Sequence, residues 1–193
     1  MAKGLVTIQS DRALREAVDK VSELLQEIHD HSGRDFKKPW KIRFPRGYIR
    51  PASNQRKRLE FLKNSSLKDN LAYTLILSDV IHWLLIRTDL GLTAKQMLIK
   101  LQLFLLGALV ESITKGHLKG RCGGHYRKRT QYLVSHRIIN VDLKKDLDWI
   151  WEMRNHMHLF LITDSEYNCT DYSHENLHRG VTAFKQLLTD LET

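Results

Sequence analysis

An arginine, an asparagine and two histidines interrupt the apolar segment 149–159, which reads WIWEMRNHMHL. The hydrophobic pattern around it is that of a helix from about residue 142 to residue 162. Residues four apart on a helix share a face, so Arg154 and His158 are predicted to lie together, with Asn155 at the edge and His156 pointing elsewhere. A permanently charged guanidinium beside a titratable imidazole is a suitable pair for binding and cleaving a phosphodiester.

The elements that must position these residues are helices. Apolar residues recur at three- and four-residue steps over 10–31, 66–90, 94–115, 143–162 and 174–191, and a short helix is expected near 127–136. The stretch 94–115 is apolar almost all round, which predicts a central position. The N-terminal caps we expect are Ser10 or Asp11, Thr93, Asp142, and Ser173 or Asp171. No credible set of strands is present, so the predicted fold class is all-α, a bundle of four to five main helices.

The net charge of +9 is concentrated in one part of the chain. Residues 34–63 hold eleven lysines and arginines against two acids, whereas the remaining residues hold twenty of each. Such localisation indicates a polyanionic partner. The cations that we expect to contact it are Lys41, Arg43, Arg46, Arg50, Arg56, Lys57 and Arg58.

All three prolines of the chain fall within residues 37–51, which predicts an extended or looped segment. Trp40, Phe44 and Tyr48 recur there every four residues. These rings either anchor the segment to the body of the protein or stack on nucleic-acid bases. We therefore divide the chain into an N-terminal extension, residues 1–66, made of one helix and a basic loop, and a helical domain, residues 67–193.

The stretch from Leu147 to Leu159 resembles the signature of the HEPN superfamily, in which an arginine, usually followed by asparagine, precedes a histidine near a helix end. The matching residues are Arg154, Asn155 and His158. Three residues separate the arginine from the histidine, where the common form has four to six. The segment LLGALVE, which ends at Glu111, looks like the early core helix of these domains. The resemblance covers about residues 68–193 and implies a HEPN-like helical bundle.

The resemblance also implies a function: a metal-independent endoribonuclease of the kind used in bacterial toxin or phage-defence systems. In such an enzyme His158 would transfer protons, Arg154 would hold the phosphate, Asn155 would orient the histidine or contact the phosphate, and Glu111 would fix Arg154. RNA, a second copy of the chain and an antitoxin-like protein are the expected partners. No cofactor or metal is expected, because the histidines and cysteines lack the spacing of a zinc site.

Three alternatives remain open. The HEPN-like domain can be a non-catalytic module that binds RNA or a nucleotide, or that dimerises with another protein. The pair formed by Arg154 and Glu111 can be purely structural. A basic helical DNA-binding or scaffolding protein is the third, although the chain shows no helix-turn-helix pattern with a polar recognition helix.

Two features bear on the compartment. Cys122 and Cys169 have no CxxC spacing, and the N-terminal residues lack the apolar run of a signal peptide, so we expect a reducing, cytoplasmic location. The apolar run 97–113 is interrupted by polar residues, so we expect no membrane span. The glycine-rich loop 115–125 lacks the Lys-Ser/Thr of a P-loop and is either a flexible connection or a contact for RNA phosphates.

Overall fold

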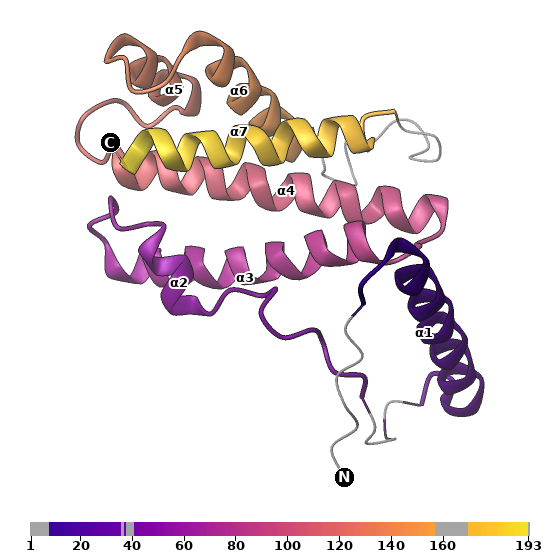
Figure 1. Cartoon of the computed structure of the whole chain (residues 1–193). Coiled ribbons are helices and arrows are strands. Elements are labelled where there is room, and N and C mark those ends of the chain that lie inside the picture. Colours follow the sequence, from indigo (N-terminus) through magenta and orange to yellow (C-terminus); the bar gives the residue numbers. More distant parts are fainter. Residues whose placement is uncertain (1–7, 36, 38–40, 157–169, 193) are drawn as a thin grey trace. The chain divides into compact units, whose positions relative to one another are not determined.

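The computed structural model describes residues 8–35, 37, 41–156 and 170–192, and over these residues it consists of helices without strands (Figure 1). The all-α prediction is therefore confirmed. The chain separates into two units, residues 1–44 and residues 45–193. Residues 45–66, which the sequence assigns to the N-terminal extension, belong with the second unit.

The first unit contains one long helix, α1 (Asp11–Ser32). It begins as expected, because the hydroxyl of Ser10 accepts a hydrogen bond of 3.1 Å from the amide of Ala13. No residue of α1 is buried. Its apolar stripe is about half exposed, at Leu14, Val18, Val21, Leu25 and Ile28.

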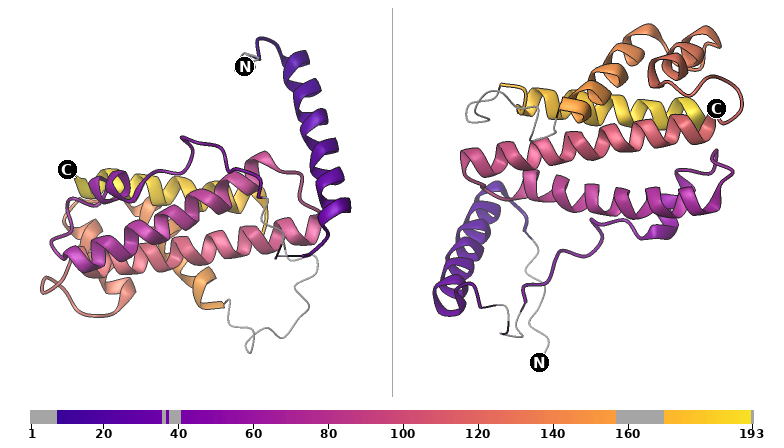
Figure 2. Two further views of the ribbon diagram at one scale, coloured as in Figure 1. Left: turned by 90° about the horizontal axis from the view of Figure 1, so that it is seen from below. Right: turned by 180° about the vertical axis from the view of Figure 1, so that it is seen from behind.

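Within the described residues of the second unit there are six helices: α2 (Ala52–Lys57), α3 (Ser65–Arg87), α4 (Leu92–His117), α5 (Tyr126–Ser135), α6 (Val141–His156) and α7 (His174–Glu192). As predicted, α4 is central, because it contacts α3, α5, α6 and α7. Figures 1 and 2 show α3, α4 and α7 as three long rods, and α6 packs on both α4 and α7, with α5 against α4 and α6.

The core of this unit follows from the apolar face of each helix. Leu103, Leu106, Leu109 and Ile113 of α4 are at most 2% exposed, and each such burial contributes about 1.5–3 kcal/mol. By length and composition α4 could also cross a bilayer, which we did not expect from the sequence. However, 56% of that apolar stretch is buried inside the protein, as in the core helix of a water-soluble domain.

Two local predictions differ from the structure. Helix α2 was not expected, because its six residues are too few to show a hydrophobic period; it is held instead by Gln55, Leu59 and Leu62, which are at most 2% exposed. Helix α4 begins after Gly91 without a side-chain cap, so Thr93 does not cap it.

The caps of the last two helices can be compared in the same way. The amide of Leu143 in α6 donates a hydrogen bond of 2.7 Å to the side chain of Asn140, so Asp142 is not the cap. The amide of Asn176 in α7 donates to the hydroxyl of Ser173 at 3.2 Å, as expected.

Candidate active site

Helix α6 carries the motif, and its apolar period decides where the motif lies. Leu143, Leu147, Ile150 and Met153 are buried against the core. Arg154 follows Ile150 by four residues, so it continues this face at the C-terminal end of the helix. The apolar period of the motif helix predicts that Trp149 is largely buried, whereas the structure leaves it partly exposed.

The close approach of α4 to α6 depends on Gly107. A Cβ atom at this position would lie 2.5 Å from Cβ of Arg154 and 3.0 Å from the carbonyl oxygen of Ile150. No residue larger than glycine fits there without moving one helix. The absence of a side chain thus brings the backbone of α4 against the base of the Arg154 side chain, one helical turn before Glu111.

Arg154 and Glu111 form an ion pair across this crossing. Nη1 of Arg154 lies 3.2 Å from Oε2 of Glu111, and both side chains are about a third exposed, at 32% and 31%. The same Nη1 donates a hydrogen bond of 2.9 Å to the side-chain oxygen of Asn155. The expected pairing of Arg154 with Glu111 is confirmed. About a third of the Arg154 side chain remains exposed beside this pair.

The other motif residues divide into two sets. His156 is the last residue of α6 and is exposed, in keeping with its predicted orientation away from the pair. His158, which is predicted to share a face with Arg154, lies outside the described residues, as do Met157 and Cys169. The structure thus brings together Glu111, Arg154 and Asn155 of the predicted catalytic set.

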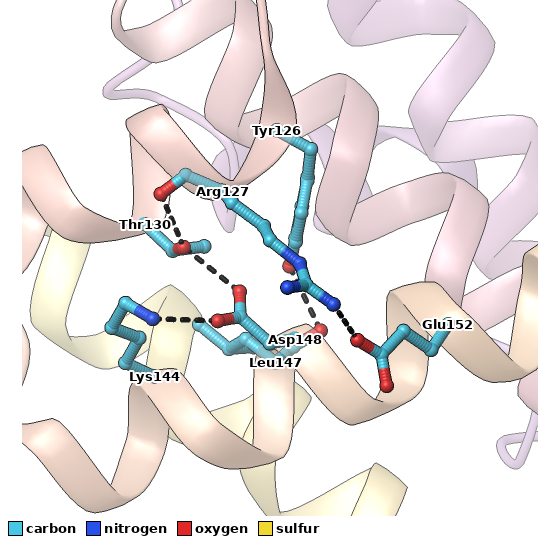
Figure 3. Close-up of polar contacts among 7 residues, drawn as sticks. All are labelled: Tyr126, Arg127, Thr130, Lys144, Leu147, Asp148 and Glu152. Carbon is cyan, nitrogen blue, oxygen red and sulfur yellow. Dashed lines mark hydrogen bonds and ion pairs between the residues drawn. The ribbon is translucent and has the colours of Figure 1, made fainter.

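A polar network that we did not anticipate from the sequence joins α5 to α6 next to the motif (Figure 3). The buried hydroxyl of Tyr126 donates 2.8 Å to the carbonyl of Leu147. The fully buried Thr130 donates 2.8 Å to Asp148, which also accepts from Lys144 at 2.7 Å. An ion pair between Arg127 and Glu152 lies on the outside of the network.

These contacts fix the orientation of α6 and hence of Arg154. Burial is the main reason why the pKa of Tyr126 is raised above its ordinary value, with the carboxylate of Asp148 adding to the effect. The phenol therefore stays protonated and keeps donating to the backbone of α6. A polar residue every three to four positions along 144–152 is the only signal in the sequence, and a solvent-exposed helix face gives the same signal.

The seven cations predicted to contact a polyanion differ in their surroundings. Lys41, Arg43, Arg46 and Lys57 are exposed. Arg50 pairs with Asp79 at 3.1 Å, Arg56 pairs with Asp69 at 3.1 Å, and Arg58 donates 2.7 Å to the side chain of the buried Gln55. Three of the seven therefore also stabilise the fold of the second unit.

The burial of the aromatic residues in this segment helps to decide between their two expected roles, anchoring the segment and stacking on bases. Phe44 and Tyr48 are half-buried, and burial raises the pKa of Tyr48 above its ordinary value, with Asp79 contributing. Tyr48, which belongs to the second unit, therefore fits anchoring better than stacking on bases. Trp40 lies outside the described residues.

The glycine-rich loop contributes cations to a second basic surface. Lys119 and Arg121, together with Lys63 near the start of α3, line a cavity of about 480 Å³ that also contains His117. The loop is tied to α5, because Arg129, which is 3% exposed, donates to the carbonyl of Gly124. Its geometry is compatible with a contact to phosphate groups.

Comparison with protein-family models, curated proteins and solved structures finds no match to this chain.

Proposed function

We propose that the chain is a HEPN-like, metal-independent endoribonuclease whose active site is built on Arg154. The observation that carries the proposal is the Arg154–Glu111 pair: an arginine of the motif helix, held at 3.2 Å by a carboxylate of the central helix and a third exposed. A guanidinium that is fixed and still accessible can bind a phosphodiester bidentately. Glu111 acts as a positioning residue.

The proposed reaction uses the RNA's own 2′-hydroxyl as nucleophile. The 2′-oxygen forms a bond to the adjacent phosphorus while the bond from phosphorus to the 5′-oxygen breaks. His158 takes the proton of the 2′-hydroxyl or gives one to the leaving 5′-oxygen, and Arg154 stabilises the charge on the phosphoryl oxygens. The products are a 2′,3′-cyclic phosphate and a 5′-hydroxyl. Asn155, bonded to Arg154 at 2.9 Å, orients the guanidinium or the imidazole.

One histidine per chain provides either the acid or the base, so we propose a homodimer in which a second His158 provides the other. The biological setting we propose is a cytoplasmic toxin or phage-defence system with an antitoxin-like protein partner. The exposed cations Lys41, Arg43, Arg46 and Lys57 would give the protein its affinity for RNA backbone.

The test is cleavage of a single-stranded RNA in the presence of EDTA, with a DNA of the same sequence as the control, because DNA lacks the 2′-hydroxyl. We expect a 2′,3′-cyclic phosphate product, and a rate lower by roughly 10²- to 10⁴-fold for His158→Ala and for Arg154→Ala. His156→Ala is the matched control, since it removes an exposed imidazole two residues away. Loss of activity in His156→Ala with full activity in His158→Ala would contradict the assignment.

RNA binding can be tested separately from cleavage by measuring affinity against salt concentration. For a single strand the slope of log K against log[salt] falls by about 0.7 for each phosphate group that the protein no longer neutralises. We expect Lys57→Gln, at an exposed position, to lower the slope by about this amount. Arg56→Gln should lower it less, because Arg56 is paired with Asp69 at 3.1 Å.

A non-catalytic RNA-binding or dimerising module is the second candidate, and one observation favours it. The guanidinium of Arg154 already binds Glu111 and Asn155, an arrangement that a purely structural pair would also show. If the wild-type protein binds RNA with a marked salt dependence and does not cleave it, this second function is the correct one.

A further inference from the structure

A cavity of about 410 Å³ lies in the second unit, well within the size range of sites for small molecules. One face of α3 lines it with Leu75, Ser78, Asp79 and His82, which follow the helical period. Helix α4 adds Gln102 and Leu106, helix α7 adds Phe184 and Lys185, and the segment before α3 adds Tyr48, Arg50 and Arg58. None of these residues belongs to the Arg154 site.

Two polar side chains at this cavity have unused hydrogen-bonding atoms. Gln102 is 1% exposed; its amide nitrogen donates 2.7 Å to the hydroxyl of Ser78, and its amide oxygen has no partner among the described residues. Turning the amide over leaves the other end unpartnered. The buried Nδ1 of His82 likewise has no partner in the described part of the chain. Unsatisfied buried polar atoms are costly, so this wall of the cavity is not fully satisfied by the described residues.

The charges around the cavity are unbalanced. Asp79 is the one carboxylate that lines the cavity among the described residues, and its side chain is only 14% exposed. It forms an ion pair with Arg50 and accepts a hydrogen bond of 2.9 Å from the side chain of Gln55. Arg58 donates to the neutral amide of Gln55 and feels Asp79 and Glu192 only at longer range, and no ion pair forms between Arg58 or Lys185 and a described carboxylate. The cavity therefore carries an excess of positive charge.

The remaining walls are apolar. Leu75 and Leu106 are 2% exposed and Phe184 is 4% exposed, so the apolar wall of the cavity belongs to the packed core. Burial and the charges of Lys185 and Arg50 lower the pKa of His82, against the opposing effect of Asp79, so its ring is neutral near pH 7. A neutral imidazole offers one donor and one acceptor to a ligand.

We propose that this cavity binds a small organic anion, a carboxylate or a phosphate monoester with an apolar body. Arg58 and Lys185 hold its acidic group, and the apolar body packs on Leu106 and Phe184. This binding site is independent of the proposed RNA cleavage, because no residue of the Arg154 site contributes to it.

The test is calorimetric titration of the full chain with phenyl phosphate and with benzoate, which distinguish the two classes of acid. Inorganic phosphate and benzyl alcohol test the acidic group and the apolar body alone. We expect saturable binding of at least one of the two organic anions, and binding at least tenfold weaker for inorganic phosphate and for benzyl alcohol. No binding of either organic anion, or equal affinity for inorganic phosphate, would overturn the proposal.

Variants locate the site. Arg58→Gln and Lys185→Gln each remove one cation of the cavity, and we expect affinity to fall by about 10- to 100-fold, as for the loss of a charged hydrogen bond. Lys57→Gln is the matched control, because it removes an exposed charge next to Arg58 that does not line the cavity. Equal losses in Lys57→Gln and Arg58→Gln would mean non-specific attraction and would refute the site. Lys185 is exposed, so its substitution leaves the fold intact if Arg58→Gln proves unstable.

Discussion

Arginines lie beside carboxylates both at the crossing of α4 with α6 and at the cavity lined by α3, α4 and α7, but the two regions differ in how far their polar groups are satisfied. At the crossing, Arg154 binds both Glu111 and Asn155. At the cavity, Arg58 has no carboxylate partner among the described residues, and one end of the Gln102 amide is unpartnered. A satisfied pair positions a side chain, whereas unused hydrogen bonds leave capacity for a ligand.

The largest effect should come from disturbing the crossing itself. Alanine at Gly107 places its Cβ 2.5 Å from Cβ of Arg154 and 3.0 Å from a backbone oxygen, and neither atom is the end of a flexible side chain. We expect a net loss of about 1–3 kcal/mol in the free energy of unfolding, despite the better helix propensity of alanine. Urea unfolding followed by circular dichroism measures it.

Gly116→Ala is the control for that experiment, since it lies on the same helix. Its Cβ would also approach within 2.5 Å of another atom, but that atom is Cδ2 of Leu67, the end of a flexible side chain. We expect a change within about 1 kcal/mol, because helix propensity offsets the repacking. Equal losses for the two variants would show that the close approach at Gly107 does not hold the crossing together.

A second prediction contrasts a satisfied network with an unsatisfied one. Thr130→Val deletes the 2.8 Å donor to Asp148 at a fully buried position, so we expect a loss of about 1–3 kcal/mol. Gln102→Leu removes one bond to Ser78 together with an unpartnered amide atom, so the net change should be close to zero. Thermal unfolding of both variants measures the contrast. A large loss in Gln102→Leu would indicate that water or another group already satisfies this amide.

How far the sequence predicts this molecule depends on whether a feature is local. The apolar period locates five of the helices, because it reports one face of each helix, and a short helix near 127–136 was also expected. The pairing of Arg154 with Glu111 was also predictable, since an arginine on an apolar helix requires a counter-charge. Helix α2 was not predictable, because six residues depend on tertiary packing for their stability.

The cavity was also not predictable from the sequence, for a different reason. Gln102 was visible only as an interruption of an apolar helix, and His82 as a single polar residue. Their association with Arg58 and Lys185 depends on three helices and a preceding segment that are far apart in the chain. The hydrophobic pattern of a sequence shows which face of each helix is buried. It does not show which helices pack against one another.

A third prediction asks how strongly the satisfied pair contributes to stability. In a double-mutant cycle of Arg154→Met and Glu111→Gln, we expect a coupling of about 0.2–1 kcal/mol, because both side chains are a third exposed and solvent screens them. The coupling should shrink in 1 M salt. A coupling well above this range that is insensitive to salt would favour the purely structural interpretation of Arg154.

The smallest expected effect concerns the pH dependence of stability, and it depends on His82, which lines the cavity. Burial lowers the pKa of His82 below the ordinary value of 6.5, Lys185 and Arg50 add to this, and Asp79 opposes it. Arg58, which lines the same cavity, faces it as a further cation. A lowered folded-state pKa means that, below pH 6.5, the unfolded chain binds a proton that the folded protein resists. This contribution to stability is complete above pH 6.5 and declines as the pH falls toward the lowered value.

His82→Gln should therefore flatten the fall in unfolding free energy between about pH 7 and the acid side of the transition, while His156→Gln, at an exposed position, controls for the loss of an imidazole. His117 contributes in the same direction, because burial and the charge of Arg121 lower its pKa, so the flattening is partial. Saturating phenyl phosphate stabilises both proteins by mass action. Its negative charge beside His82 also raises the pKa of that ring, so the pH slope should flatten more in the wild type than in His82→Gln. If the ligand changes the pH slope of the unfolding free energy equally in both proteins, the anion binds away from His82. The unsatisfied polar groups of the cavity would then not mark a ligand site.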